Sequence, residues 1–108
     1  MSAPVKLRPL TEKQKKILWF IVYEHYINKR IPRQIDIARK FAINQHAAAT
    51  HLKFIEKKGY ITKKPHIPQS ITLSAQAIRL ITGKSPQRMK SQRAVIEVFG
   101  EEEVVASF

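Results

Sequence analysis

Histidine is the main residue type in this sequence that could bind a metal or act as a general acid or base, because the 108 residues include no cysteine. The histidines are His25, His46, His51 and His66, and no two of them have the i, i+4 spacing that places two ligands on one helix face. The glycines are scattered, so no glycine-rich phosphate loop is present, and no Ser-His-Asp pattern can be argued. The sequence therefore predicts no metal, no cofactor and no enzymatic activity.

The segment from Gln45 to Thr50 offers a different chemistry, because it combines hydrogen-bonding side chains with small apolar ones. A glutamine can pair with adenine, and an alanine can contact the methyl group of thymine. Side chains of these types suit the edges of base pairs in the major groove. We expect the exposed residues of this segment to be Gln45, His46, Ala47, Ala49 and Thr50.

A helix from Gln45 to Lys58 would position these side chains. Ala48, Leu52 and Ile55 recur at four- and three-residue spacing, which predicts one buried face and leaves the residues named above exposed. Asn44 precedes this helix and can cap it through its side-chain oxygen.

A shorter helix is expected just before it, from Pro32 to about Phe41. Proline suits the first turn of a helix, where no backbone N–H is needed. Ile35, Ala38 and Phe41 recur at three-residue spacing and predict the buried face of this helix. The three residues at positions 42–44 then form a turn, so the two helices have the layout of a helix-turn-helix.

Two β-prone runs follow, Tyr60-Ile61-Thr62 and Ile71-Thr72-Leu73, and the segment between them is basic and contains prolines. They can pair as a hairpin, and a helix-turn-helix followed by a hairpin is a winged helix. Basic side chains on these elements would bind backbone phosphates without selecting a base sequence. We expect the phosphate contacts to come from Arg33, Lys53, Lys63, Lys64 and His66.

The first helix is predicted from Glu12 to Asn28, with a capping-box pattern at Thr11 and Gln14. Its apolar residues surround it almost completely, so Trp19 and Tyr23 either pack in the core or form a dimer surface. A further helix at residues 74–81 would pack back on it. The predicted fold is mainly α with a small β-hairpin, a three-helix core plus wing and a fourth helix.

Three groups of residues together resemble the DNA-binding domain of LexA-type repressors. They are residues 10–18 (LTEKQKKIL), the run Pro32 to Ala38, and His51-Leu52-Lys53 followed by residues 57–61 (KKGYI). The resemblance covers roughly residues 10 to 73 and implies a bacterial or phage winged-helix repressor whose third helix reads operator DNA. The positions that match the family's base-reading face are Asn44, Gln45, His46, Ala47, Ala49 and Thr50.

The sequence departs from the family pattern in several respects. Arg33 replaces the Ser or Thr that usually caps the second helix. Ala42 replaces the glycine of the turn, where a left-handed backbone would cost about 1 kcal/mol, so we expect a turn of different shape. The operator-reading residue types are not reproduced, so the operator cannot be inherited. The family's C-terminal latent protease domain has no room in 108 residues, and we expect neither self-cleavage nor the dimer contact that this domain provides.

The chain is strongly basic, with 20 Lys and Arg against 8 Asp and Glu, a net charge of +12 and a pI near 10.3. This excess is larger than solubility requires and predicts a polyanionic partner. No apolar run approaches the length of a membrane span, and the first ten residues lack the apolar stretch of a signal peptide. We expect a cytoplasmic protein that binds double-stranded DNA and no membrane.

The distribution of charge predicts the domain organisation. We expect an N-terminal arm at residues 1–9, the winged helix at residues 10–81, a basic linker at residues 82–93 and an acidic, apolar tail at residues 94–108. Every Lys and Arg precedes residue 94, whereas the tail carries 4 Glu. The tail is a disordered solubilising segment, a dimer contact, or a segment that folds back on the basic DNA face.

The leading hypothesis is a small transcriptional regulator, a repressor, that binds duplex DNA sequence-specifically. A homodimer would form through the first helix or through residues 94–108. Two alternatives remain. A winged helix can bind RNA, or DNA without sequence preference, and the basic stretches at residues 6–16 and 84–93 permit this. It can also be a protein-interaction module, which predicts an acidic or broadly apolar recognition face, and residues 45–50 are neither.

Overall fold

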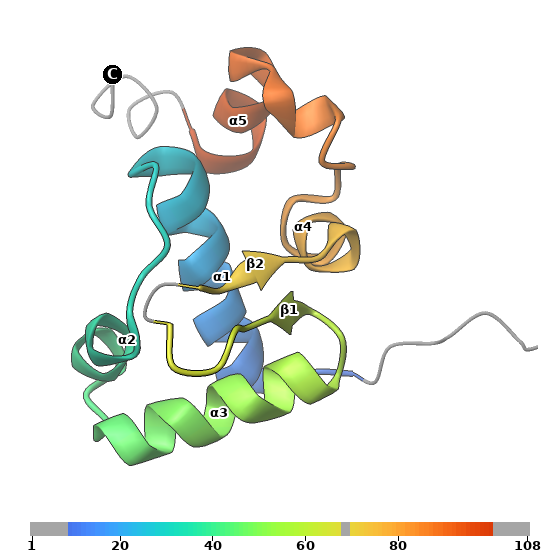
Figure 1. Cartoon of the computed structure of the whole chain (residues 1–108). Coiled ribbons are helices and arrows are strands. Elements are labelled where there is room, and N and C mark those ends of the chain that lie inside the picture. The colour runs from blue at the N-terminus through green and yellow to red at the C-terminus, as the bar shows by residue number, and fades with distance from the viewer. Residues whose placement is uncertain (1–8, 68–69, 101–108) are drawn as a thin grey trace, which may run out of the picture.

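The computed structural model describes residues 9–67 and 70–100 and has the architecture of a winged helix (Figure 1). In chain order the elements are α1 Glu12–Ile27, α2 Gln34–Phe41, α3 Gln45–Lys57, β1 Ile61–Thr62, β2 Thr72–Leu73, α4 Ala75–Thr82, the 3-10 helix η1 Arg88–Lys90, and α5 Gln92–Phe99. The predicted class, mainly α with a small hairpin, is confirmed. Within the described residues, no helix is long and apolar enough to span a bilayer.

Helix α1 forms the centre of the molecule, with α3 crossing near its N-terminal end and α5 packed toward its other end (Figure 1). It begins with the predicted capping box, in which the Gln14 N–H donates to Thr11 Oγ1 and the Thr11 N–H donates to Gln14 Oε1, both at 3.2 Å. Ile17, Leu18 and Ile21 are completely buried. The burial of one face of α1 under α2, α3 and α4 explains why a strongly apolar helix is stable here.

The main core joins α1 to the two helices of the helix-turn-helix. The predicted buried face of α3 is confirmed, since Ala48, Leu52 and Ile55 are all at most 2% exposed. The predicted face of α2 was partly wrong, because Ile37 is completely buried while Ile35 is only half-buried. The inner face of α2 therefore follows an i, i+1, i+4 pattern rather than a strict three-residue spacing.

The turn between α2 and α3 keeps the left-handed backbone that glycine would favour. Ala42 has φ 54° and ψ 44°, and its N–H donates to the Arg39 carbonyl at 3.3 Å. The expectation that Ala42 would change the shape of the turn was therefore wrong. The packing of the half-buried Ile43 against the core holds this conformation in spite of its cost.

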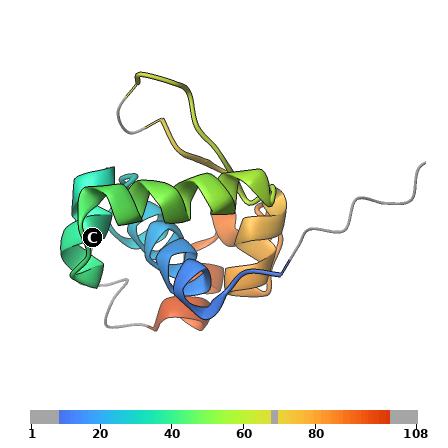
Figure 2. The ribbon, with the colours of Figure 1, turned by 90° about the horizontal axis from the view of Figure 1, so that it is seen from below.

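The wing is a short antiparallel hairpin in which Ile61 faces Leu73 and Thr62 faces Thr72. Ile61 is buried, which anchors the base of the hairpin on the core, while Thr62 is exposed. The hairpin extends away from the helices next to α3 (Figure 2). This places its basic segment beside the exposed side of α3.

The region after residue 81 differs from the predicted linker and tail. Ser91 caps α5, whose span Gln92–Phe99 crosses the expected boundary between residues 93 and 94. Met89, which we assigned to the linker, is 2% exposed and packs with Ile27, Ile78, Ala94 and Val95 in a second cluster. Apolar burial thus extends the folded unit to residue 99. Residues 101–108 of the predicted tail and residues 1–8 of the predicted arm lie outside the described residues.

Phe99 connects α5 to α1 through aromatic contacts. Its ring lies edge-on to Trp19 at 6.1 Å and to Tyr23 at 5.7 Å, and these two rings stack on each other at 5.1 Å. Such edge-to-face pairs stabilise beyond the apolar area that they bury. The aromatic side of α1 is therefore partly covered by this chain itself, although Trp19 remains 45% exposed.

Candidate nucleic-acid interface

The N-terminal half of α3 presents the predicted polar face to solvent. Gln45, His46 and Thr50 are exposed, whereas Ala47 and Ala49 are half-buried and leave only part of their methyl groups accessible. Seen from the α3 side, this helix lies across the molecule with the hairpin projecting beside it (Figure 2). The arrangement leaves the helix free to enter a groove while the hairpin lies next to it.

Asn44 caps α3 as predicted. Its Oδ1 accepts a hydrogen bond from the Ala47 N–H at 2.7 Å, which fixes the orientation of the side-chain amide. The Asn44 amide NH₂ is exposed and available as a donor. Its nitrogen can donate to a base acceptor such as N7 or O6 of a purine.

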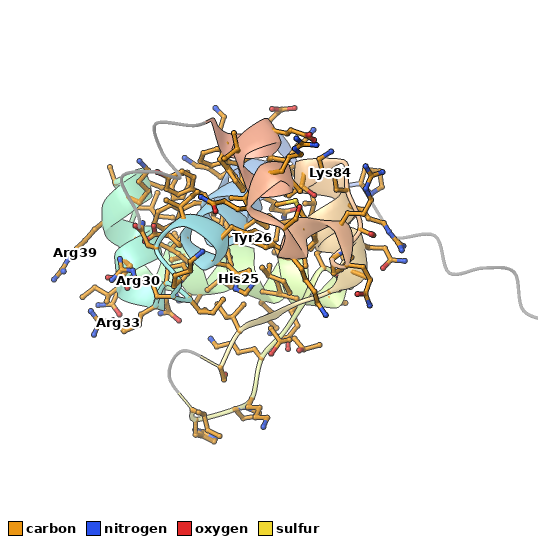
Figure 3. All side chains as sticks on the ribbon, turned by 90° about the horizontal axis from the view of Figure 1, so that it is seen from above. His25, Tyr26, Arg30, Arg33, Arg39 and Lys84 are labelled. Carbon is orange, nitrogen blue, oxygen red and sulfur yellow. The ribbon has the colours of Figure 1, made fainter. Side chains whose placement is uncertain are left out.

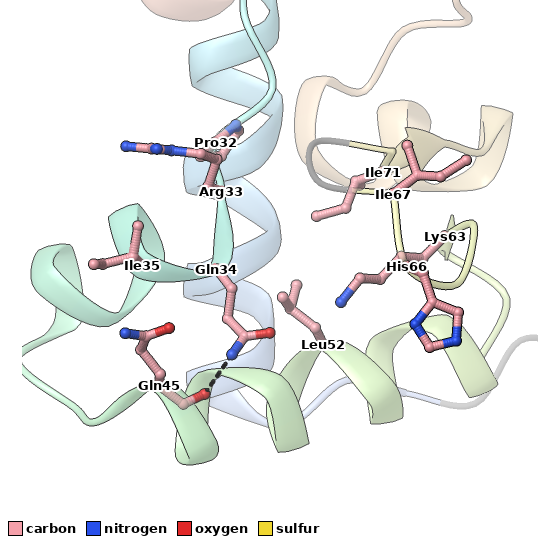
Figure 4. Close-up of a pocket in the computed structure, with 10 residues that line it drawn as sticks. All are labelled: Pro32, Arg33, Gln34, Ile35, Gln45, Leu52, Lys63, His66, Ile67 and Ile71. Atoms are coloured by element: carbon pink, nitrogen blue, oxygen red, sulfur yellow. Dashed lines mark hydrogen bonds between the residues drawn. The ribbon is translucent and has the colours of Figure 1, made fainter.

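Gln45 is positioned by a residue that the sequence analysis did not identify, Gln34 on α2. The Gln34 Nε2 donates to the main-chain carbonyl of Gln45 at 3.0 Å (Figure 4). This bond joins the first turn of α3 to α2 through the backbone of Gln45. The side-chain amide of Gln45 takes no part in it. No periodicity signals such a contact, because it joins two polar residues eleven positions apart.

Thr50 is also oriented by its own helix. Its hydroxyl donates to the His46 carbonyl at 3.0 Å, a bond that fixes the rotamer of the threonine. The hydroxyl oxygen keeps its lone pairs as acceptors for an exocyclic amino group. Its methyl group offers an apolar contact as well.

A hollow of about 400 Å³ separates the start of α3 from the wing (Figure 4). Its floor is apolar, because the buried side chains of Leu52 and Ile71 contribute to it, and basic side chains lie at its edge. The basic side chains at this edge suit contacts with a sugar-phosphate strand. The lining consists of Pro32, Arg33, Gln34, Ile35, Gln45, Leu52, Lys63, His66, Ile67 and Ile71.

Arg33 stands at the N-terminus of α2 and does not cap it with its side chain. The cap is supplied by Asp36, whose Oδ2 accepts the Arg33 N–H at 2.9 Å and lies 3.4 Å from the Arg33 Nε. The backbone hydrogen bond and the neighbouring guanidinium lower the pKa of the Asp36 carboxyl. The Arg33 side chain is 53% exposed, and its terminal nitrogens remain available for a phosphate.

The tip of the wing is shaped by a β-turn at residues 64–67. The Ile67 N–H donates to the Lys64 carbonyl at 3.4 Å, and His66 has a left-handed φ of 63°, the combination typical of a type II turn with Pro65 in its second position. Ser70 braces this turn, because its hydroxyl accepts the Lys64 N–H at 2.9 Å and donates to the Lys64 carbonyl at 3.1 Å. The side chains of Lys63, Lys64 and His66 are left exposed.

The structure gathers some of the predicted site residues around the hollow and leaves others outside it. Arg33, Gln45, Lys63 and His66 line it, although they come from three different elements. The exposed residues Lys53 and Lys64 do not. Two exposed apolar side chains on these elements were not singled out in the sequence, Phe54 on α3 at 46% and Ile67 on the wing at 52%.

Within the described ranges, no three His, Asp or Glu side chains are grouped to hold a metal ion. The fold and this face instead define the class of winged helix-turn-helix proteins. Residues 7–70 match the LexA DNA binding domain family, which is more than half of the chain, so the chain belongs to that family.

Full-length relatives extend this match. The chain is 37% identical to the LexA repressor of Thermotoga maritima over 93 residues, which is 84% of this chain and 46% of the relative. It is 36% identical to the LexA repressor of Pseudothermotoga lettingae over 100 residues, 84% of this chain and 49% of the relative. With the LexA repressor of Thermosipho melanesiensis it shares 44% identity over 69 residues, 62% of this chain and 34% of the relative. The chain thus spans about half or less of the length of these relatives.

Proposed function

We propose that this protein is a sequence-specific duplex-DNA-binding repressor. Helix α3 enters the major groove and presents Gln45, His46, Ala47, Ala49 and Thr50 to base edges, with the Asn44 amide at its start. Arg33, Lys53, Lys63, Lys64 and His66 hold phosphates on either side. The family membership supports this proposal, and so do the relatives, which are named as repressors.

One observation carries the proposal, the hollow that brings a predicted base-reading residue, Gln45, together with the predicted phosphate ligands Arg33, Lys63 and His66. A recognition helix in the major groove and a wing beside it must have a sugar-phosphate strand between them. The basic side chains at the edge of this hollow fit such a strand. Its position supports an interface in which Gln45, Arg33, Lys63 and His66 contact the same stretch of DNA.

Selection from a pool of random duplexes tests sequence-specific binding. We expect the wild-type protein to enrich one sequence, and Gln45→Ala or Thr50→Ala to change the preferred base at one position each, with a discrimination of about 1–3 kcal/mol lost at that position. Gln76→Ala, an exposed glutamine on α4, is the matched control and should leave the preference unaltered. An unchanged preference in the Gln45 and Thr50 variants would remove α3 as the recognition helix.

Binding measurements with a selected duplex, a random duplex and a duplex RNA distinguish the alternatives. Equal binding to a selected duplex, a random duplex and a duplex RNA would identify a module without sequence preference. Absence of binding to all three would favour a protein-interaction module. Repression itself is tested by placing the selected sequence across a promoter, where the wild type should lower transcription and the Gln45 variant should not.

We also propose that a second copy pairs through the exposed part of α1. Trp19 and the 42% exposed Leu80 of α4 line one surface hollow together with the charged residues Glu12, Lys15 and Lys16, so two large apolar side chains remain exposed there after α5 has packed. Residues 94–99 contribute less to such a contact, since Ala94 and Val95 are buried inside the folded unit. The pairing would present two recognition helices to a two-fold operator.

Sedimentation over a range of concentrations tests the pairing. Leu80→Glu should shift the protein toward monomer, because it replaces one of these two exposed apolar side chains with a charge. Gln87→Glu, which changes the net charge equally beyond α4, should not. Removing residues 94–108 is a poor test, because it deletes Ala94 and Val95 from the second cluster. Equal masses for wild type and Leu80→Glu at every concentration would exclude this interface.

A further inference from the structure

The end of the molecule opposite α3 carries basic side chains that the proposed DNA interface does not use. We define the α5 basic surface as Arg88, Lys90 and Arg93, three exposed residues of η1 and the first turn of α5. Figure 1 places α5 and α3 at opposite ends of the molecule, with α1 between them. The view from the α5 end shows Lys84 on this side, with Arg33 and Arg39 toward the α2 edge (Figure 3).

The three basic residues are not required to hold the local fold together. Their neighbours Met89, Ala94 and Val95 are the buried members of this region. Ser91 caps α5 by accepting the Ala94 N–H at 3.1 Å. Burial and capping thus account for η1 and α5, whereas the exposed charges between the buried positions add mutual repulsion.

Within the described residues, little negative charge opposes this surface. Glu97 is the only Asp or Glu of the described residues after α3, and Glu101, Glu102 and Glu103 follow α5 outside them. Glu97 is already paired, because its Oε2 lies 2.8 Å from the Lys84 Nζ. The Lys84 hydrogen bond lowers the pKa of Glu97, and the charges of Arg93 and Arg88 lower it further. Both arginines line the same shallow hollow as Glu97. With Glu97 neutralised by Lys84, the charges of Arg88, Lys90 and Arg93 remain in excess among the described residues of this region.

We propose that the α5 basic surface binds the phosphates of a second DNA duplex, so that one molecule holds two duplexes, one at each end. The sixteen residues of α1, which lies between α3 and α5, span about 24 Å, three times the Debye length of about 8 Å at physiological salt. The two surfaces therefore act as separate electrostatic sites. Binding at the second one releases counterions and selects no base sequence, because no helix face with base-reading side chains accompanies it.

A bridging assay tests this proposal with the full chain. One random-sequence duplex is fixed to beads, and capture of a second, fluorescent duplex is measured after the protein is added. We expect the wild type to capture the second duplex, and Arg88→Gln/Lys90→Gln/Arg93→Gln to reduce capture by at least about tenfold. The matched variant Arg88→Lys/Arg93→Lys keeps the charges and should capture as the wild type does.

Two further measurements separate this proposal from the primary DNA interface and from dimerisation. The triple glutamine variant should melt at the wild-type temperature and enrich the same sequence in the random-duplex selection, which shows that α3 still works. Undiminished capture by this variant would overturn the second site and assign the bridging of duplexes to paired copies of the protein. In that case Leu80→Glu should abolish the capture. Competition with poly-glutamate gives the other decisive result. If poly-glutamate displaces the second duplex as well as unlabelled DNA does at equal charge, the surface binds acidic protein and the proposal fails.

Discussion

Asp36 shows how one residue compensates for a departure from the family pattern. Arg33 cannot accept a hydrogen bond from the helix backbone, because a guanidinium has no acceptor atom. The carboxylate three residues later accepts the Arg33 N–H instead and also faces the positive end of the α2 dipole. The start of α2 therefore depends on the ionised form of Asp36.

This dependence predicts a pH effect on stability. The pKa of Asp36 in the folded protein lies below its ordinary value of 3.8, so the carboxylate stabilises the fold above that pH and the effect is lost as the pH falls through the lowered pKa. Asp36→Asn should thus be less stable than the wild type at neutral pH, and the difference should disappear in strong acid. Urea unfolding of both proteins at several pH values measures it. A difference that does not vary with pH would contradict the assignment.

Ala42 predicts a stabilising substitution. It is exposed and left-handed, so Ala42→Gly removes the steric cost of the Cβ without leaving a cavity and should raise the free energy of unfolding by about 1 kcal/mol. Ala49→Gly in the middle of α3 is the control, since glycine in a helix interior should lower stability by a similar amount. Chemical denaturation of the three proteins gives both values. Destabilisation by both glycines would mean that the turn is not left-handed in solution.

At the residue scale, the sequence predicted side chains governed by local rules and missed those governed by contacts between elements. The caps at Thr11 and Asn44 depend on neighbours three positions away, so their patterns are visible in the sequence. The link from Gln34 to Gln45 and the burial of Ile37 depend on how α2 packs on the other helices. The left-handed Ala42 was unexpected for the same reason, because packing outweighs a local cost of about 1 kcal/mol.

At the scale of elements, the wing is a hydrogen-bonded turn that exposes basic side chains. The Lys64 backbone is held by Ser70, so its side chain and that of Lys63 can be removed without disturbing the turn. Lys63→Ala and Lys64→Ala should each weaken binding to all duplex sequences alike and lower the salt dependence of log K by about 0.9. Binding measured at several salt concentrations gives these slopes. Lys90→Ala, at the other end of the molecule, should leave the slope for a single limiting duplex unchanged.

Helix α5 shows where element prediction from sequence was incomplete. Its signals were present, a serine cap at Ser91 and apolar residues at Ala94, Val95 and Phe99. The change from basic to acidic composition at residue 94 indicated a boundary there. A change in the charge of exposed side chains does not mark where a helix begins, and α5 spans this position. The partners that make α5 stable, Ile27 and Ile78, are distant in sequence, so no local window contains the reason for its burial.

At the scale of the whole molecule, the two apolar clusters share side chains. Tyr26, Leu73 and Phe99 pack against both the main core and the Met89 cluster. Leu73 belongs to β2 at the base of the wing, and Tyr26 lies near the end of α1. The region that carries the α5 basic surface therefore shares its apolar packing with the elements that carry the proposed DNA interface.

This continuity predicts that the protein unfolds as one unit. Met89→Ala, a change in the second cluster at a side chain only 2% exposed, should lower the free energy of unfolding by about 2–4 kcal/mol, a large share of the 5–15 kcal/mol typical of a domain. Because the clusters share side chains, the loss should appear as a lower midpoint of one transition, seen equally by Trp19 fluorescence and by helical circular dichroism. Leu80→Ala, at an exposed apolar position, should change stability by no more than about 0.5 kcal/mol. Two separate transitions in the Met89 variant, the first without loss of duplex binding, would show instead that η1 and α5 form an independent unit.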